Sequence, residues 1–232
     1  ERDDLLRIHD KLAEADAAIA ALHAAYAGKA ARLSDLRQVE APKLGGLIER
    51  EIGLLGMKKA RFEVRVLPRP VPLEAADGVR DTGWDEVEFL ISPNPGEDLK
   101  PLRKIASGGE LSRIMLALKS AGRAREGAST LIFDEIDAGI GGRTADFVAQ
   151  KLRRLAQTHQ VICITHLPQI ASHADHHFRI EKKVEKDRTF SHVRELRGED
   201  RVEEIARLMA GSRITPAALA SAREMLQWED RD

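Results

Sequence analysis

Residues 104–122 are KIASGGELSRIMLALKSAG, in which a Ser-Gly-Gly turn directly precedes an amphipathic run, and residues 130–139 are TLIFDEIDAG. The first stretch has the apolar period of a helix, whereas the second begins as a short apolar run that is typical of a strand. A glycine turn that opens a helix, followed by a strand that ends in carboxylates, is a layout typical of phosphate chemistry. These stretches predict an α/β fold with functional groups at the ends of its elements.

Composition and charge restrict the class of protein. Of the 232 residues, 43% are hydrophobic and 32% are charged, which suffices for one sizeable core with an appendage or for two small domains. The 37 basic and 38 acidic side chains nearly cancel, so a nucleic-acid contact would need a local patch. The single cysteine, Cys163, excludes a disulfide framework and indicates a reducing compartment. No apolar run approaches the roughly 18 residues of a membrane span. Because the chain starts at Glu1 without an initiator methionine, we expect it to be a fragment.

The first 40 residues predict a coiled-coil arm. Seam positions follow alternating steps of three and four residues: Leu5, Ile8, Leu12, Ala15, Ile19, Leu22, Tyr26, Lys29, Leu33 and Leu36. No second heptad stretch of matching length occurs, so we expect an antiparallel partner helix in a missing segment, or a helix of another subunit. The alternative is an amphipathic helix packed on its own domain. Pro42 and Gly45-Gly46 are expected to interrupt the helix, and a shorter helical stretch should end near Gly56.

Beyond the arm, strand and helix patterns alternate. Strands are predicted at 61–66, 86–92, 130–133 and 160–165, and strand-like runs at 178–184 and 190–196. Helices are predicted at 110–123 and 143–158, from Pro168, and from about Arg201 and Thr215; residues 93–101 are expected to form a loop. This order predicts a mainly parallel sheet with flanking helices and an antiparallel edge, in a domain of residues 41–232 that follows the arm at 1–40.

Three segments carry candidate functional groups. The turn at 107–109 places backbone N–H groups, a hydroxyl and the positive end of a helix dipole at one spot, which predicts an anion site; an ordinary helix N-cap is the alternative. Asp134 and Glu135 follow an apolar strand, and His166 follows the next one in VICITH. These side chains are therefore expected at the carboxyl edge of one sheet, where α/β proteins bind ligands.

In this order and spacing, the segments resemble the C-terminal half of an ABC-type ATPase head, with the signature motif ASGGE, the Walker B motif TLIFDE and the switch histidine of ITH. An arm that enters just before this half is similar to the layout of SMC-like proteins. The longer stretches resemble the bacterial SMC-like proteins of DNA double-strand-break repair over residues 86–210: VEFLISPNPGEDLKPLRKIASGGELSRIMLALK, LIFDEIDAGIGGRTA and ITHLPQIASHAD.

The resemblance implies ATP and Mg²⁺ as cofactors and a homodimer in which two heads sandwich the nucleotide. It implies that Ser107, Gly108 and Gly109 touch the γ-phosphate of the ATP that the opposing head holds. The phosphate loop G-x-x-x-x-G-K-[ST] is absent, since the only lysine after a glycine is Lys29 in AGKAA. The nucleotide's cradle is therefore expected in a missing N-terminal lobe.

The resemblance also implies roles for the groups at the sheet edge. Asp134 would support Mg²⁺ through water, Glu135 would orient and deprotonate the attacking water, and His166 would sense the γ-phosphate. One acid has to serve the metal while a second stays available as the base. The stretch Ala138-Gly139-Ile140-Gly141 departs from the family's dimer-contacting loop, which often ends in Asp, so the contact across the dimer is expected from backbone or from another residue. Asp137 is a plausible but unassigned member of that loop.

By the same resemblance, the whole protein would act on double-strand DNA ends in repair and recombination, in the cytoplasm at the nucleoid and without a membrane. The alternatives are a non-catalytic coiled-coil structural module with vestigial motifs, and another ABC-type ATPase such as a transporter subunit. An upstream phosphate loop followed by a long heptad stretch would favour the repair ATPase.

Two further clusters carry weaker alternatives. One has a spacing compatible with metal binding, but a polar surface turn is favoured: His173, Asp175, His176 and His177. The other lies on one helix, where a solvated face is favoured over a DNA-binding patch: Lys151, Arg153 and Arg154. The mixed charges of EKKVEKDR, residues 181–188, predict a hairpin tip.

Overall fold

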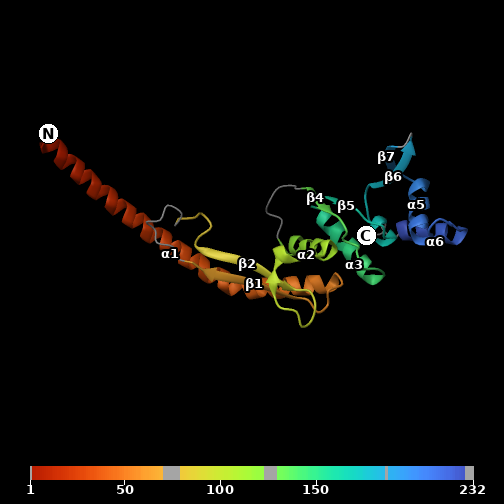
Figure 1. Cartoon of the computed structure of the whole chain (residues 1–232), viewed down its shortest axis with the longest axis horizontal. Coiled ribbons are helices and arrows are strands. Elements are labelled where there is room, and N and C mark those ends of the chain that lie inside the picture. The colour runs from red at the N-terminus through yellow and green to blue at the C-terminus, as the bar shows by residue number, and fades with distance from the viewer. Residues whose placement is uncertain (1, 70–78, 123–129, 186–187, 228–232) are drawn as a thin grey trace. The chain divides into compact units, whose positions relative to one another are not determined.

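The computed structural model describes residues 2–69, 79–122, 130–185 and 188–227, which fall into two compact units (Figure 1). The first unit contains Glu1–Leu47, Arg61–Ser92 and Gly96–Leu102. The second contains Ile48–Ala60, Pro93–Pro95 and Arg103–Asp232. The expected boundary at residue 40 between an arm and an ATPase lobe stays a prediction.

The helix α1 runs without a break from Arg2 to Leu54, so the prediction that Pro42 and Gly45-Gly46 interrupt it is wrong. A proline inside a helix removes a hydrogen bond and crowds the preceding turn, at a cost of about 3 kcal/mol. Packing therefore has to maintain the helix here. A Cβ on Gly45 would lie 3.2 Å from the carbonyl oxygen of Phe62, so this glycine permits close contact between α1 and the strand that contains Phe62.

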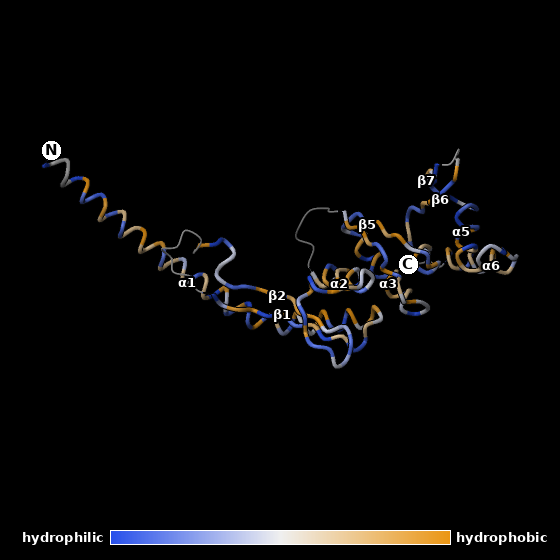
Figure 2. The backbone as a smooth tube through the Cα atoms, viewed as in Figure 1, coloured by the Kyte–Doolittle hydropathy of each residue, from blue (hydrophilic) through white to orange (hydrophobic). Residues whose placement is uncertain are grey.

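The N-terminal part of α1 exposes much of its apolar seam. Ile8, Leu12, Ile19 and Leu22 are each at least 50% exposed, and Figure 2 shows hydrophobic residues recurring along this part of the helix. The side chain of Leu5, the first seam residue, lies outside the described residues. The exposed seam is the pattern expected of a helix that pairs with another helix.

Farther along α1, the helix contacts its own unit. The Tyr26 hydroxyl accepts a hydrogen bond from the backbone N–H of Arg80 (3.3 Å), and Arg37 forms an ion pair with Asp85 (2.9 Å). A Cβ on Gly83 would lie 3.1 Å from Leu33. The alternative of packing on the chain's own domain therefore holds for this middle part of the helix.

The first unit contains an antiparallel sheet with the order β1-β2-β3. The strands are β1 (Arg61–Pro68), β2 (Asp85–Ser92) and β3 (Lys100–Pro101), and β1 pairs with β2 along its whole length. The loop predicted at 93–101 is thus shorter than expected, because Lys100 and Pro101 pair with Ile91 and Leu90. A 3-10 turn, η1 (Leu102–Lys104), follows.

The second unit contains the remaining elements, and the expected α/β class is confirmed. Its helices are α2 (Gly108–Ala121), α3 (Arg143–Ala156), α4 (Pro168–Ala171), α5 (Glu199–Ala210) and α6 (Pro216–Gln227). Its strands are β4 (Thr130–Phe133), β5 (Gln160–Cys163), β6 (His177–Glu185) and β7 (Arg188–Leu196). The pair β4–β5 is parallel, whereas β6–β7 is an antiparallel pair in a separate sheet. Most of the hairpin tip predicted at 181–188 belongs to these two strands, and residues 186–187 lie outside the described residues. Arg123, where the helix seen as α2 was predicted to end, also lies outside the described residues.

The core of the second unit lies against one face of the parallel pair. Fully buried side chains come from α1, α2, α3 and the segment after β4, among them Ile52, Ile114, Val148 and Ile136. The expectation that β4 and β5 are buried strands holds for one face only. Alternate residues face outward, and Ile132, Ile162 and Ile164 are 67%, 45% and 51% exposed. Within the described part of the chain, packing against these strands is therefore one-sided.

A smaller cluster at the C-terminal end joins Ala171 after β5 to α5 and α6 through Val202, Ile205, Ala206 and Ala222. Its charged residue Glu204 is only 5% exposed and is bonded by Arg207 and Arg179. Among the described residues, no helix combines the length and the apolar character that crossing a membrane requires.

Candidate functional site

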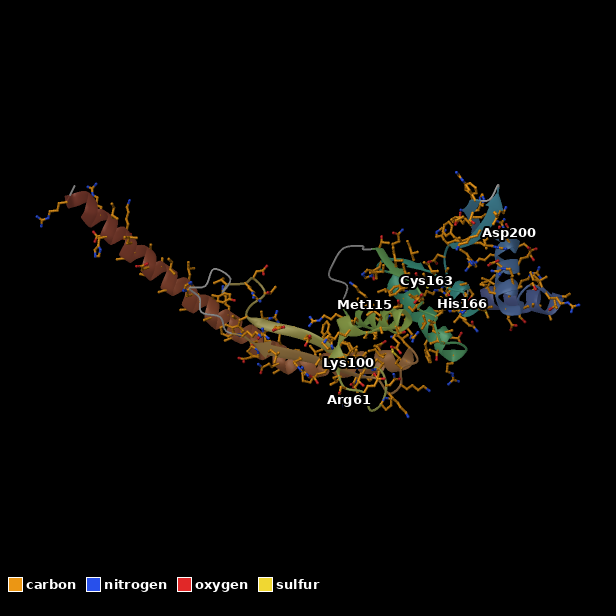
Figure 3. The ribbon with its side chains drawn as sticks, in the orientation of Figure 1. Arg61, Lys100, Met115, Cys163, His166 and Asp200 are labelled. Carbon is orange, nitrogen blue, oxygen red and sulfur yellow. The ribbon has the colours of Figure 1, made fainter. Side chains whose placement is uncertain are left out.

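The parallel strands β4 and β5 bring two of the three candidate segments to one edge of their sheet. Phe133 pairs with Cys163, and the N–H of Ile164 donates to the Phe133 carbonyl (2.9 Å). Asp134 and Glu135 directly follow β4, and His166 lies just beyond the end of β5 (Figure 3). The expected placement at a common carboxyl edge is therefore confirmed.

The third segment, the Ser-Gly-Gly turn, starts α2. Ser107 is the N-cap, and its hydroxyl oxygen accepts a weak hydrogen bond from the N–H of Glu110 (3.4 Å). The capping interpretation is therefore correct for this side chain. Capping does not exhaust the N–H groups of a first helical turn, and the helix dipole still favours an anion here.

Two side chains of α2 bind the backbone of residues 134–138, which we call the acidic connector. The hydroxyl of Ser112 donates to the carbonyl of Asp134 (2.7 Å). The Nη1 group of Arg113 donates to the carbonyls of Ile136 (3.2 Å) and Ala138 (2.8 Å). Arg113 is only 7% exposed. Burial lowers the pKa of its guanidinium, and the negative charge of Glu110 opposes this shift.

Two glycines allow the connector to lie against the start of α2. A Cβ on Gly108 would lie 2.5 Å from the Glu135 carboxylate. A Cβ on Gly109 would lie 2.8 Å from both the Ala138 side chain and the Glu135 carbonyl oxygen. Glu135 itself adopts a left-handed backbone with φ of 55°, which is uncommon for a residue other than glycine. The structure thus brings Gly108, Gly109 and Glu135 together.

Asp137, which lies between the two connector residues bonded by Arg113, holds the segment after β5. Asp137 is 4% exposed, and its Oδ2 accepts hydrogen bonds from the Thr165 hydroxyl (2.5 Å) and from the His166 backbone N–H (2.8 Å). The same oxygen lies 3.0 Å from Nδ1 of the His166 ring. The connector therefore contacts both α2 and the turn that carries His166.

The two acids directly after β4 are exposed, and their oxygen atoms suit a hard cation. The Oδ1 atom of Asp134 accepts a hydrogen bond from the N–H of Glu135 (2.9 Å), which fixes the orientation of the Asp134 carboxylate. The Glu135 carboxylate instead approaches Gly108, so the two acids lie in different surroundings.

The lone cysteine lies on the inner side of this edge. Burial raises the pKa of the Cys163 thiol to about 12, and the negative charges of Asp137 and Asp134 add to the shift. The thiol is therefore almost wholly protonated at neutral pH, and the protonated thiol is a poor nucleophile because the thiolate is the reactive form.

The weaker clusters have other partners. His173 contacts the Gln169 carbonyl and His176 contacts Glu195, and the part of the chain that the structure describes holds no group of three or more potential metal ligands. Burial lowers the pKa of His177, with the Arg201 charge adding to it and Glu204 opposing it. Lys151 forms a largely buried ion pair with Glu51 (2.6 Å), so its assignment to a solvated face is wrong.

Sequence reasoning missed the residues that connect the segments. The sequence pattern could have pointed to Arg113, because its charge lies on the same helix face as three buried residues, Gly109, Leu116 and Ala117. The role of Asp137 depends on the turn after β5, and no local pattern predicts that contact.

We expect Gly109→Ala and Gly108→Ala to differ in stability. The first places a methyl group against backbone and Ala138, which should cost about 1–3 kcal/mol. The second meets the end of a flexible Glu135 side chain that can rotate away, so the free energy of unfolding should change by no more than about 1 kcal/mol. Urea unfolding of the two variants measures this, and equal destabilisation would contradict the close packing of Gly109.

We expect Cys163 to react with Ellman's reagent at pH 8 roughly 10³-fold more slowly than a free thiol, because its thiolate fraction is smaller by about that factor. Denaturant should restore the rate of a free thiol, which provides the control. A native rate close to that of glutathione would show that the thiol is neither buried nor affected by the two carboxylates.

Comparisons with known proteins identify relatives over nearly the whole chain. The DNA repair protein RecN of Halalkalibacterium halodurans is 40% identical over 227 residues, which is 97% of this chain and 39% of that protein. RecN of Deinococcus radiodurans is 47% identical over 208 residues, 89% of this chain and 35% of the relative. The chain thus spans less than two fifths of these relatives' length.

No protein-family model matches the chain. Among solved structures, the Smc head domain of Pyrococcus furiosus with an extended coiled coil, bound to the C-terminal domain of ScpA, matches with a TM-score of 0.43 and 23% identity. That match covers 69% of this chain and 36% of the other. Over the segment that it shares with these two proteins, the chain is thus similar to RecN, at 40% and 47% sequence identity.

Proposed function

We propose that this chain is part of an SMC-like ATPase that acts in DNA double-strand-break repair and recombination. The observation that carries the proposal is the acidic connector, which contacts the N-terminus of α2 through Arg113 and Glu135 and the end of β5 through Asp137. The sequence similarity supports the same function, because the similar proteins are DNA repair proteins. ATP hydrolysis is proposed for the whole protein, of which this chain supplies one part.

Ser107, Gly108 and Gly109 are proposed to bind the γ-phosphate of an ATP held by the opposing head. The fit is supported by an anion that already lies here, since the Glu135 carboxylate packs against Gly108. A phosphate would benefit from the backbone N–H groups and the helix dipole at the start of α2. Ser107 and Gly108 are exposed, and neither glycine has a side chain that would exclude a ligand.

Asp134 is proposed to support Mg²⁺ through water, and Glu135 to orient and deprotonate the attacking water. Mg²⁺ and ATP would supply the divalent charge and the transferable phosphoryl group. Both carboxylates are exposed at the strand edge, and each is held differently, Asp134 by the N–H of Glu135 and Glu135 beside Gly108. Glu135 has to leave the start of α2 to act as a base, and its flexible side chain allows this rotation.

His166 is proposed to sense the γ-phosphate. Its side chain is 74% exposed, yet its backbone and Nδ1 are held by a buried carboxylate. A ring that is anchored on one side and open on the other suits contact with a ligand from outside.

The nucleotide's cradle is proposed to lie in an N-terminal lobe, because these 232 residues contain no G-x-x-x-x-G-K-[ST] sequence. We propose that the protein forms a homodimer through ATP sandwiched between two heads, and that it acts on DNA ends in the cytoplasm at the nucleoid. The exposed seam from Ile8 to Leu22 supports a coiled-coil arm.

We expect Glu135→Gln, in a longer protein that includes the phosphate-binding lobe, to lower the rate of ATP hydrolysis by about 10² to 10⁴-fold while ATP binding persists. Glutamine keeps the shape of the side chain and a hydrogen bond to water but cannot accept a proton. ATP-bound dimers should therefore accumulate, which sedimentation can measure alongside phosphate release.

The matched control is Glu203→Gln, which changes an exposed acid on α5 away from the site and should leave hydrolysis unchanged. Unchanged hydrolysis in Glu135→Gln would favour the non-catalytic coiled-coil module. Hydrolysis by the purified 232-residue chain that Glu135→Gln does not affect would place the active site elsewhere.

A further inference from the structure

The buried carboxylate of Asp137 is the group on the acidic connector that the proposed reaction does not use. It lies between the two acids at the end of β4 and the turn after β5, with its side chain 5% exposed. A buried carboxylate is costly unless hydrogen-bond donors satisfy it. Every donor that the structure gives to its Oδ2 comes from Thr165 or His166.

These contacts fix the turn that carries His166. The Thr165 hydroxyl donates to Asp137 (2.5 Å) and accepts from the N–H of Leu167 (3.0 Å), so the turn is bonded on both sides of the histidine. The His166 N–H donates to the same carboxylate oxygen (2.8 Å). These bonds therefore fix the backbone of His166 independently of any contact that its ring makes.

The ring contact adds a chemical consequence. Which nitrogen of a neutral histidine carries the proton is set by the hydrogen bond that the other groups offer, and an ionised carboxylate accepts but does not donate. Asp137 Oδ2 lies 3.0 Å from Nδ1. Within the described residues, Nε2 has no hydrogen-bond partner, so this nitrogen is the one available to a ligand.

We propose that Asp137 is a positioning residue for His166: it holds the turn after β5 and accepts the Nδ1 proton of the ring. Nε2 then faces the ligand, as an acceptor in the neutral ring and as a donor to a phosphate oxygen once the ring carries a second proton. The inference deepens the proposed function, on which it rests for the role of His166 in ATP hydrolysis. The contacts with Thr165 and His166 also account for the burial of Asp137 within its own chain, without a contact across a dimer.

The tautomer of His166 tests the direct link and needs no nucleotide. In the ¹⁵N-histidine-labelled chain at pH 8, we expect His166 to carry its proton on Nδ1, as read from its two ring-nitrogen shifts. Asp137→Ala should move the proton to Nε2. Asp137→Asn keeps a carbonyl acceptor in nearly the same place and should retain the Nδ1 tautomer. His166→Gln assigns the signals by their loss.

Thr165→Val is the matched control, because it removes both hydroxyl bonds of the turn, to Asp137 and from the N–H of Leu167, but leaves Asp137 beside the ring. It should retain the Nδ1 tautomer. A proton on Nε2 in the unsubstituted chain would overturn the proposal without any variant having to fold. So would an unchanged tautomer in Asp137→Ala, or a shift in Thr165→Val as large as in Asp137→Ala.

Hydrolysis by the longer protein tests the consequence for the reaction. Asp137→Ala and His166→Gln should each lower the turnover rate by roughly 10²-fold, since a small displacement of a catalytic group has an effect of that order. The double variant should lose no more than the single ones, because both changes remove the same positioned ring. Additive losses would overturn the positioning role.

The two measurements separate the two proposals. If His166→Gln leaves hydrolysis unchanged while the tautomer of His166 responds to Asp137 substitution as expected, the assigned role of His166 in the reaction is wrong. Asp137 then positions a ring that hydrolysis does not require. If His166→Gln lowers hydrolysis while the tautomer is indifferent to Asp137, the proposed function stands and the positioning role is wrong.

Discussion

The buried guanidinium of Arg113 is the interaction on which the arrangement of the site depends. It donates from α2 to the carbonyls of Ile136 and Ala138, which are the middle and the end of the acidic connector. A charged group with little exposure is costly unless its donors are used, and a charged hydrogen bond contributes about 1.5–3 kcal/mol. These two bonds therefore stabilise both the helix side and the connector side of the contact.

The position of the connector follows from this contact and from the glycines that it meets. Gly109 lets Ala138 and the Glu135 carbonyl lie directly on the helix start, and Gly108 leaves room for the Glu135 carboxylate. Between the two residues bonded by Arg113, Asp137 reaches the turn after β5. Five consecutive residues thus contact both a helix N-terminus and a histidine from another strand. Movement on either side of the connector would therefore displace the other side.

The sequence predicted the chemical groups of this site better than their connections. The end of β4 and the end of β5 could be placed at one edge because parallel strands align their carboxyl ends. The approach of Gly109 to Ala138 and the bond from His166 to Asp137 join residues far apart in the chain. The periodicity of a local stretch of sequence therefore cannot predict these contacts. Arg113 gave a weak signal as a charge on a buried helix face.

The wrong expectations have equally physical causes. Propensity alone predicts a break at Pro42, but the helix continues through it, and the contact of β1 at Gly45 provides packing beside the unfavourable residue. Short apolar runs do not distinguish strands buried on one face from strands buried on two. The outward side chains of Ile132 and Ile162 therefore contradicted an expectation that the sequence pattern could not decide.

The central claim is that the connector transmits the position of α2 to the turn that carries His166. Amide hydrogen exchange of His166 in an Arg113→Met variant tests this most directly, because Met fills similar space without donating and Arg113 has no bond to His166. We predict that the His166 amide exchanges on the order of 10-fold faster, as its bond to Asp137 weakens. Met115→Ala, on the exposed side of α2, should leave it unchanged. Faster exchange confined to Ile136 and Ala138, with His166 unaffected, would contradict the account.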